Sequence, residues 1–326
     1  MMGTVILGTG SSLPKRIMTN KDLEGIVDTD DAWIYSRTGI KNRRIGGAGE
    51  QTHQLAAAAS REALQMAGLS AEELDIIVVG TISSHMLMPS CACFVQKELG
   101  AVNAFAYDIN AACSGFIYGM DMADKYIRSE HRKKILVIGA ETLSSRLNWD
   151  DRNTCILFGD GAGAAVLGHS DDNGRGVIGS NHRSDGSLWK LLHMHAPPSY
   201  NPDLEVPDNS GSYIVMEGRE VFKYAVKAME DSVRGLLQQE NISMDSIKLF
   251  IPHQANMRIL TNLLDRLGFP EEKVFFNVSE YGNTSAASVP IALDEANRQG
   301  LFTEGDIILL CAFGGGFTWG ASLIKW

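Results

Sequence analysis

Apolar and polar positions along the chain predict strands and helices that alternate. Near-continuous apolar runs are typical of strands buried on both faces, and they lie at residues 74–81, 134–139 and 307–311. A shorter apolar run at residues 4–7 is followed by glycines and predicts a first strand. Apolar residues at helical spacing predict helices, which lie at residues 51–68, 90–99, 116–127 and 221–239. The alternation predicts an α/β fold.

Two segments resemble each other and indicate an internal duplication. Residues 156–167 contain Phe-Gly-Asp-Gly followed by small residues, and residues 311–324 contain Phe-Gly-Gly-Gly followed by a similar run. Self-similarity of this kind predicts two related units. The polar, glycine-rich stretch at 168–176 marks the seam, so we expect one half over residues 1–172 and the other over 173–326. A shared site is then expected where the halves meet.

Residues 183–212 interrupt the alternation of strands and helices. Four prolines fall in this stretch, together with several Gly, Asn and Ser residues. Loops of this length in compact domains are often lids or walls of a site, and a solvated excursion explains the composition equally well.

Composition and charge exclude several classes of function. A chain of 326 residues that is 44% hydrophobic has enough apolar residues for a large core. Its net charge of −10 argues against general nucleic-acid binding but allows a local basic patch. No apolar run approaches the roughly 18 residues that span a bilayer. Residues 1–10 lack the regions of a secretory signal. We therefore expect a cytoplasmic protein with no nucleic-acid or membrane partner.

The cysteines favour reduced thiols over metal binding. There are five, none forms a CxxC pair, and the spacing of Cys91 and Cys93 suits neither a structural zinc site nor a redox motif. Free thiols in a cytosolic protein are the simplest interpretation. We expect no metal site.

Cys113 is the strongest candidate for a reactive residue. Residues 105–110 predict a buried strand, residues 111–115 are mostly small and predict a tight turn, and a helix follows. At a helix N-terminus the macrodipole and the free backbone N–H groups favour the thiolate, which is the form that attacks thioesters. The alternative is a small buried core residue, which is the common role of a free cysteine.

His253 and Asn283 lie at two further junctions between an apolar strand or turn and a helix. His253 follows an apolar run, and Asn283 follows Gly282 among small residues. Capping a helix or forming a tight turn would also explain them. Sites usually form at strand ends of α/β sheets. If a pseudo-twofold relates the halves, the turn at Cys113 faces the region of residue 283, and the three side chains meet.

Six segments together resemble β-ketoacyl-[acyl-carrier-protein] synthase III. Three are Asp108-Ile-Asn-Ala-Ala-Cys-Ser-Gly-Phe, Pro252-His-Gln-Ala-Asn and Gly282-Asn-Thr-Ser-Ala-Ala-Ser, and the others are residues 33–40, 158–163 and 312–320. The similarity runs in order from residue 4 to 326. It implies a thiolase-like fold with five layers, α-β-α-β-α, and a homodimer.

The resemblance also implies a reaction. An acyl-CoA primer, expected to be acetyl-CoA or another short acyl-CoA, condenses with malonyl-acyl-carrier protein as carbon dioxide leaves, which initiates type II fatty acid synthesis. Cys113 matches the acyl-accepting nucleophile, and His253 and Asn283 match the pair that acts on the malonyl thioester. Backbone N–H groups of Cys113 and of the turn at 314–316, with Gly315 favoured, would form the oxyanion hole. No cofactor is implied, because coenzyme A enters as a substrate.

Binding residues follow from the same resemblance. Those for coenzyme A are Trp33, Arg37, Arg152, Gly218 and Asn256. Those for docking an acidic carrier protein are Gln254, Arg258 and Lys223, with Lys227 and Arg266 on the same predicted helices. Those for the acyl pocket are Met88, Leu143, Phe158, Met216 and Phe313. Met88 matches a position that reaches into the pocket of the partner subunit, and its flexibility leaves chain length open.

Three other interpretations are distinguishable. A thiolase-fold condensing enzyme of secondary metabolism would use the same three residues, and activity with malonyl-CoA instead of malonyl-carrier protein would favour it. A non-catalytic carrier-binding subunit commonly lacks the nucleophile, which this chain retains. Gly8-Thr-Gly10 suggests a dinucleotide-binding protein, but no full GxGxxG follows a strand.

Overall fold

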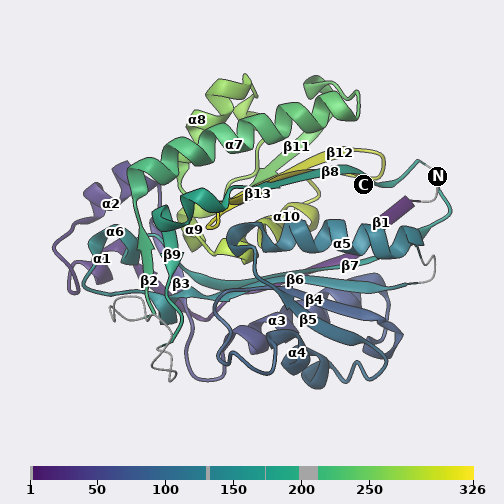
Figure 1. Cartoon of the computed structure of the whole chain (residues 1–326), viewed down its shortest axis with the longest axis horizontal. Coiled ribbons are helices and arrows are strands. Elements are labelled where there is room, and N and C mark those ends of the chain that lie inside the picture. The colour runs from purple at the N-terminus through teal and green to yellow at the C-terminus, as the bar shows by residue number, and fades with distance from the viewer. Residues whose placement is uncertain (1–2, 130–132, 173, 198–211) are drawn as a thin grey trace.

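The chain folds around two main β-sheets in the computed structural model, which describes residues 3–129, 133–172, 174–197 and 212–326 (Figure 1). The first sheet has the strand order β1 (Gly3–Ser12), β7 (Asp160–Ser170), β6 (Ile135–Thr142), β4 (Ile76–Gly80), β5 (Phe105–Ile109). The second has the order β11 (Ile247–Pro252), β12 (Ile307–Gly314), β13 (Thr318–Lys325), β8 (Gly176–Ser184). Two small sheets pair β2 (Arg16–Thr19) with β3 (Asn42–Ile45), and β9 (Leu192–Met194) with β10 (Ile214–Met216).

Helices cover both faces of each main sheet (Figure 1). The outer face of the first sheet carries α3 (Thr52–Ala67) and α4 (Cys91–Leu99), the space between the sheets holds α5 (Gly115–Ser129) and α10 (Ser288–Arg298), and the outer face of the second carries α7 (Gly218–Gln239) and α8 (Met257–Leu267). The short helices are α1 (Asn20–Leu23), α2 (Asp31–Thr38), α6 (Arg152–Cys155) and α9 (Val278–Tyr281). The predicted five-layered α-β-α-β-α fold is confirmed.

Local sequence explains where several elements begin and end. Gly68 and Gly100 end α3 and α4 in the left-handed region, with φ of 65° and 71°, which glycine adopts without a steric cost. Ser90 caps α4 by accepting a hydrogen bond from the Cys93 backbone N–H. β4 is buried along its whole length, as expected for a strand with helices on both faces.

The two main sheets repeat one topology. β4 pairs in parallel with β6, β6 antiparallel with β7, and β7 antiparallel with β1. In the second sheet β11, β12, β13 and β8 pair in the same sequence of directions. The chain passes from the first sheet to the second between residues 170 and 176. This crossing is consistent with the predicted boundary between the two halves of the chain at residue 172. The boundary itself stays a prediction.

The central helices join the two halves of the chain. α5 and α10 lie in one apolar core that includes Phe116 and Leu293. Each follows a 3₁₀ turn, η2 (Ala112–Ser114) before α5 and η7 (Ser285–Ala287) before α10, and the two turns contact each other. Ala112 and Ser285 have matching positive φ angles of 45° and 50°. The turn at Cys113 therefore meets the region of residue 283, as the duplication predicts.

β5 differs from the expectation of a buried strand. Phe105 is 52% exposed, and the other four residues are only half-buried. The reason is topological, because β5 pairs with β4 alone and forms an edge of its sheet. An edge strand presents unpaired backbone N–H and C=O groups to whatever lies beside it.

The insertion at residues 183–212 is less irregular than its composition suggests. The 3₁₀ segment Gly186–Leu191 and strand β9 lie within it, and β9 pairs with β10 just beyond it. Residues 198–211 lie outside the described residues.

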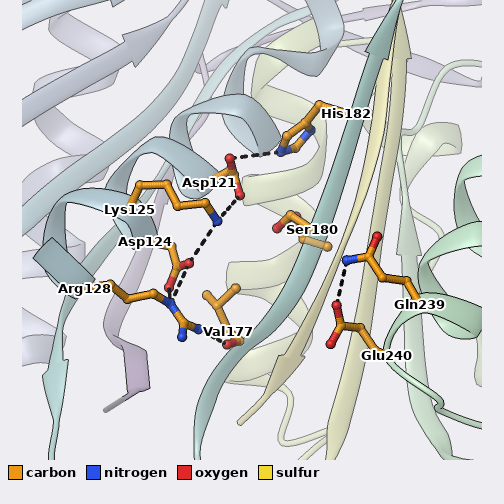
Figure 2. Close-up of polar contacts among 10 residues, drawn as sticks. Asp121, Asp124, Lys125, Arg128, Val177, Ser180, His182, Gln239 and Glu240 are labelled. Atoms are coloured by element: carbon orange, nitrogen blue, oxygen red, sulfur yellow. Dashed lines mark hydrogen bonds and ion pairs between the residues drawn. The ribbon is translucent and has the colours of Figure 1, made fainter. Parts of the chain in front are cut away.

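A polar network ties α5 to the second sheet (Figure 2). Arg128 Nε donates to both carboxylate oxygens of Asp124 at 2.8 Å, and Arg128 Nη2 donates to the Val177 carbonyl of β8 at 2.8 Å. Asp121, one turn earlier, lies 3.7 Å from His182 Nε2. The helix that follows Cys113 is therefore held along its length against β8.

We expect Asp124→Ala to lower the free energy of unfolding by about 2 kcal/mol, because it leaves a partly buried guanidinium without its carboxylate. The Asp124 side chain is only 3% exposed. Lys125→Ala is the matched control, because the Lys125 side chain is 66% exposed, and it should change stability by less than about 0.5 kcal/mol. Urea unfolding measures both, and equal effects would contradict the anchoring role of Asp124.

Candidate active site

One large cavity reaches from the surface to the junction of the two halves. Its volume is about 1560 Å³, and its lining includes Cys113, His253 and Asn283. Trp189 and Leu192 of the insertion also line it, so the insertion forms a wall of the cavity. The structure thus brings together three side chains that lie 140 and 30 residues apart in the sequence.

Cys113 is a buried thiol in η2, directly before α5. Burial raises the pKa of the thiol to about 12, a hydrogen bond with Ser285 opposes this rise, and the charge of Glu141 adds to it. The expectation that the helix N-terminus favours a resting thiolate is therefore wrong, because the loss of solvation outweighs the local donors. The thiol must lose its proton during the reaction.

His253 follows β11 and is held at both its backbone and its ring. Its N–H donates to the Cys311 carbonyl at 2.7 Å, and its Nδ1 lies 2.5 Å from Ser288 Oγ. Burial lowers the pKa of the imidazole to about 3, so the ring is neutral at physiological pH. With Nδ1 engaged by Ser288, Nε2 is the ring nitrogen left for a substrate.

Asn283 is oriented by the turn that follows it. Its backbone N–H donates to the Leu157 carbonyl at 2.8 Å, and its Oδ1 accepts from the Ser285 N–H at 2.8 Å. Gly282 has φ of 64°, and a Cβ there would lie 2.6 Å from the Leu157 oxygen. Because Oδ1 is occupied, the Nδ2 amide is the donor that this side chain offers to a ligand.

The turn between β12 and β13 lies against the nucleophile. A Cβ at Gly314 would be 2.6 Å from the Cys113 backbone nitrogen, so only glycine permits this approach. Thr318 Oγ1 donates to the Ala111 carbonyl at 2.8 Å and joins the two turns. Gly315 lines the cavity. This placement is compatible with an oxyanion hole, and the donor residues stay a prediction.

Trp33, Arg37 and Arg152 form one cluster near the cavity. The guanidinium carbons of Arg37 and Arg152 lie 4.2 and 4.4 Å from the Trp33 ring centroid, within the range of cation–π attraction. Trp33 and Arg37 line the cavity. Arg152 is not among the residues that line the cavity, and its Nη1 donates to the Asp28 carbonyl at 2.7 Å.

Gly218 and Asn256 also line the cavity, each at the start of a helix. Gly218 is the first residue of α7. Asn256 caps α8, because its Oδ1 accepts from the Arg258 N–H at 2.8 Å. Both predicted coenzyme A residues are therefore placed by helix N-termini that border the cavity.

The predicted docking cations differ in their surroundings. Arg258 is exposed, lines the cavity and forms no ion pair within the described part of the chain. Lys223 also lines the cavity but pairs with Glu220 at 2.6 Å. Lys227 and Arg266 are paired with Asp231 and Glu230 respectively.

Gln254 is not a docking residue. It is 1% exposed, its Nε2 donates to the Pro252 and Phe275 carbonyls at 2.8 and 3.0 Å, and its Oε1 accepts from the Asn277 N–H at 3.0 Å. The docking prediction for Gln254 is wrong, because its side-chain amide is buried and forms hydrogen bonds that join two loops of the same chain. The side chain instead supports the segment that carries His253.

The acyl-pocket predictions divide into two groups. Four of these residues line the cavity: Leu143, Phe158, Met216 and Phe313. Met88 does not line the cavity of its own chain and is 85% exposed, although its neighbours Met86 and Leu87 do line it. A contribution of Met88 to a pocket would therefore have to come from a second copy of the chain.

Three polar residues around Cys113, His253 and Asn283 are not among the site residues predicted from the sequence. Ser288 holds the His253 ring, Ser285 holds Asn283 and contacts Cys113, and Glu141 accepts from Ser285. Glu141 does carry a signal in the sequence. It is an acidic residue directly after the apolar run 135–140, at the kind of strand end where functional groups gather.

Within the described ranges, no helix has the length and apolar character needed to cross a membrane. In the same ranges no three His, Cys, Asp or Glu side chains gather in a way that would hold a metal ion. All five cysteines are free.

A buried thiol, a neutral imidazole and an amide donor at the seam of a duplicated five-layered fold define a condensing enzyme of the thiolase class, which is an acyltransferase. Residues 107–186 match the family model for 3-oxoacyl-[acyl-carrier-protein (ACP)] synthase III, and residues 237–326 match the model for its C-terminal part.

Relatives of known identity agree along the full length. Beta-ketoacyl-[acyl-carrier-protein] synthase III of Desulfotalea psychrophila is 58% identical over 325 residues, 100% of both chains. The crystal structure of 3-oxoacyl-[acyl-carrier-protein] synthase III from Aquifex aeolicus has a TM-score of 0.93 and 49% identity, and covers 99% of this chain and 100% of its own. The priming β-ketosynthase of the R1128 polyketide pathway has a TM-score of 0.91 and 36% identity, covering 99% of this chain and 96% of its own. The chain belongs to the β-ketoacyl-[acyl-carrier-protein] synthase III family.

Proposed function

We propose that this protein condenses a short acyl-CoA primer with malonyl-acyl-carrier protein in the cytoplasm, without a cofactor, and so initiates type II fatty acid synthesis. The observation that carries the proposal is the meeting of Cys113, His253 and Asn283 in one cavity. A thiol nucleophile and two neutral hydrogen-bonding groups are what acyl transfer and decarboxylation each require.

In the first half-reaction Cys113 Sγ attacks the carbonyl carbon of the acyl-CoA. The tetrahedral oxyanion receives hydrogen bonds from the Cys113 N–H and from the turn that contains Gly315. Its collapse expels coenzyme A and leaves an acyl-cysteine. The close approach of Gly314 to the Cys113 nitrogen supports this assignment.

In the second half-reaction the malonyl thioester loses carbon dioxide beside His253 and Asn283. The electrons of the broken C–C bond form an enolate, whose oxygen accepts hydrogen bonds from His253 Nε2 and Asn283 Nδ2. The enolate carbon then attacks the acyl-cysteine and releases the 3-oxoacyl product. The neutral state of the imidazole supports a donor role, and the fixed Oδ1 of Asn283 leaves its Nδ2 for the enolate.

The Trp33 cluster supports coenzyme A binding in the cavity. Adenine stacks on an indole, and guanidinium groups pair with phosphates. Because both guanidiniums lie over or beside the Trp33 ring, an incoming adenine would exchange places with one of them. Gly218 and Asn256 line the same cavity, which supports a role for them beside the pantetheine arm.

A homodimer would cover an apolar edge of the molecule. Phe105 on β5 is 52% exposed, and Leu87 and Met88 are 83% and 85% exposed. An edge strand with large exposed apolar side chains is a liability in a monomer. A second copy over this edge would also bring Met88 to the acyl cavity of its partner.

Arg258→Glu is expected to raise the KM for malonyl-carrier protein about tenfold, because it replaces attraction to an acidic partner by repulsion. The rate of acyl transfer from acyl-CoA should change less than about twofold, since the guanidinium is not in contact with Cys113. Lys248→Glu is the matched control, because Lys248 is also exposed but does not line the cavity. Steady-state kinetics at low salt measure both, and an unchanged KM in Arg258→Glu would reject this docking surface.

One assay tests the proposed function. Acetyl-, isobutyryl- and octanoyl-CoA are each supplied with malonyl-carrier protein or with malonyl-CoA, and 3-oxoacyl product is measured. Product from malonyl-carrier protein with a short primer supports the proposal. Product from malonyl-CoA alone would favour a condensing enzyme of secondary metabolism. The sequence similarity favours the fatty acid enzyme, because the chain is 58% identical to β-ketoacyl-[acyl-carrier-protein] synthase III of Desulfotalea psychrophila and 36% identical to the R1128 priming β-ketosynthase.

A further inference from the structure

Glu141 is a buried carboxylate that the mechanism above does not use. It lies near the end of β6 and is 0% exposed. Its Oε2 accepts hydrogen bonds from Ser83 Oγ, from Thr81 Oγ1 at 3.2 Å and from the Ile82 N–H at 3.2 Å. Its Oε1 accepts from Ser285 Oγ at 3.1 Å. The carboxylate is thus held by neutral donors from one side and by a single hydroxyl from the other.

Ser285 stands between this carboxylate and the nucleophile. It lines the cavity together with Cys113, the turn η7 that carries it contacts the turn η2 that carries Cys113, and a hydrogen bond from its side chain opposes the rise in the Cys113 pKa. Its φ of 50° is rare for a residue with a side chain, and such strained positions cluster at functional sites. Gly139 on β6 permits this geometry, because a Cβ there would lie 2.0 Å from the Ala286 carbonyl oxygen.

The Ser285 hydroxyl has one proton to donate. A chain of hydrogen bonds from Cys113 through Ser285 to Glu141 can therefore take two arrangements. When Cys113 is a thiol, its S–H donates to Ser285 Oγ while the Ser285 hydroxyl donates to Glu141. When the proton has moved, protonated Glu141 donates to Ser285 Oγ while the Ser285 hydroxyl donates to the thiolate. The two states differ in the direction of both hydrogen bonds and in the site of the negative charge, which lies on Glu141 in the first and on Cys113 in the second.

We propose that Ser285 and Glu141 form a proton relay for Cys113, in which Ser285 is a catalytic residue that contacts the reacting sulfur and Glu141 is a positioning residue that receives the proton through it. The inference rests on the proposed function, because it concerns the acylation step of the same site. It assigns removal of the thiol proton to residues other than His253.

The step balances without any added reactant. As the Sγ–C bond forms, the S–H bond breaks and its proton moves to Ser285 Oγ, while the Ser285 proton moves to Glu141 Oε1 and the carbonyl π electrons move to oxygen. When the tetrahedral species collapses, the C–S bond to coenzyme A breaks with its electron pair on that sulfur. Ser285 returns a proton to the leaving sulfur, and Glu141 returns one to Ser285.

Electrostatics around the pair favour a resting state in which Cys113 keeps its proton and Glu141 is the stronger acid, ready to be ionised near neutral pH. Burial raises the pKa of Glu141 to about 7 and that of Cys113 to about 12, and the negative charge of Glu141 raises the Cys113 pKa further. The Cys91 thiol of α4 also faces Glu141, and burial raises its pKa above the ordinary range. His253, whose pKa burial lowers to about 3, holds a proton far less readily than Glu141.

The test is the rate of Cys113 acylation in Ser285→Ala and Glu141→Gln, measured in single turnovers with acetyl-CoA from pH 6 to 9.5. Ser285→Ala should fold, because its counterpart Ala112 holds the same positive φ as alanine. Thr81→Val is the matched control, because it removes a donor to Glu141 that is not on the path to Cys113. Thermal unfolding and circular dichroism confirm that each variant is folded.

In the native enzyme the acylation rate should level off above about pH 7, once Glu141 is ionised. In both relay variants the rate at pH 7 should fall on the order of 10²-fold, which is typical of lost general-base assistance. It should then rise about tenfold per pH unit, because only thiolate formed by solvent reacts. Thr81→Val should keep a plateau at a shifted pH.

Two results would overturn the relay. The first is acylation by Ser285→Ala within about twofold of the native rate at every pH, since general-base assistance is worth far more than that. The second is a loss of equal size at every pH, which marks a structural role. If Glu141→Gln fails to fold, the pH dependence of the acylation rate in Ser285→Ala alone supports or refutes the relay.

Iodoacetamide separates the relay from the proposed function. Alkylation of Cys113 also requires loss of the thiol proton but needs no acyl-CoA. A native enzyme that forms no acetyl adduct refutes the proposed function, and slower alkylation of Ser285→Ala at pH 7 still supports the relay. Equal alkylation rates refute the relay, whether or not acylation occurs.

Discussion

Cys113→Ala is expected to form no acyl adduct with acetyl-CoA and to lower kcat/KM on the order of 10⁴-fold or more, as loss of a covalent nucleophile does in other enzymes. The physical reason is that no other thiol can substitute for it. Among the described residues that line the cavity, Cys113 is the one cysteine. Intact mass before and after incubation, followed by mass analysis of the modified peptide, measures the effect.

Cys155→Ala is the control for this experiment. Cys155 is buried in another apolar cluster and does not line the cavity, so the variant should form the adduct as the native enzyme does. An adduct of undiminished yield in Cys113→Ala would show that the acyl group is carried elsewhere and would remove the basis of the proposed mechanism.

His253→Ala and Asn283→Ala are each expected to lower the rate of malonyl decarboxylation on the order of 10²- to 10³-fold, because each removes one donor to the enolate oxygen. Acylation of Cys113 should continue at a rate within a few-fold of native, since the proposed relay assigns the thiol proton to Ser285 and Glu141. Release of carbon dioxide from malonyl-carrier protein and adduct formation from acetyl-CoA are measured on the same preparations.

Asn283→Asp makes this experiment sharper. The aspartate keeps an oxygen for the Ser285 N–H, which Asn283 Oδ1 now accepts, but it lacks the Nδ2 donor. We therefore expect decarboxylation to fall as far as in Asn283→Ala while the turn keeps its shape. Equal losses of acylation and decarboxylation in the His253 and Asn283 variants would refute the division of labour between the two halves of the chain.

The elements most readily predicted from the sequence are those with strong local signals. The apolar run at 74–81 is β4, and the helical pattern that stops at Gly68 is α3. Local composition located β5 but not its exposure, since Phe105 is apolar but lies on a sheet edge. Burial of a strand depends on which neighbours pair with it, and that is a property of the whole sheet.

Site residues show the same division. The distinctive motifs in the sequence predict Cys113, His253 and Asn283 as site residues. The link between Ser285 and Glu141 depends on the packing of η7 against β6, which the sequence does not show. The resemblance predicts Gln254 as a docking residue, next to His253 and close to Arg258 in the sequence. Its burial, at 1% exposure, shows that proximity in the sequence does not determine which way a side chain faces.

The sequence by itself determined the chemical identities of the nucleophile, the imidazole and the amide, the duplication of the chain and the alternation of strands and helices. The tertiary structure alone decided the protonation state of Cys113, because its pKa depends on the solvation and charges that folding places around the sulfur. It also decided that the Ser285 hydroxyl and the Glu141 carboxylate lie near that sulfur. The reason is that η2 and η7 meet only when the two sheets pack around the central helices.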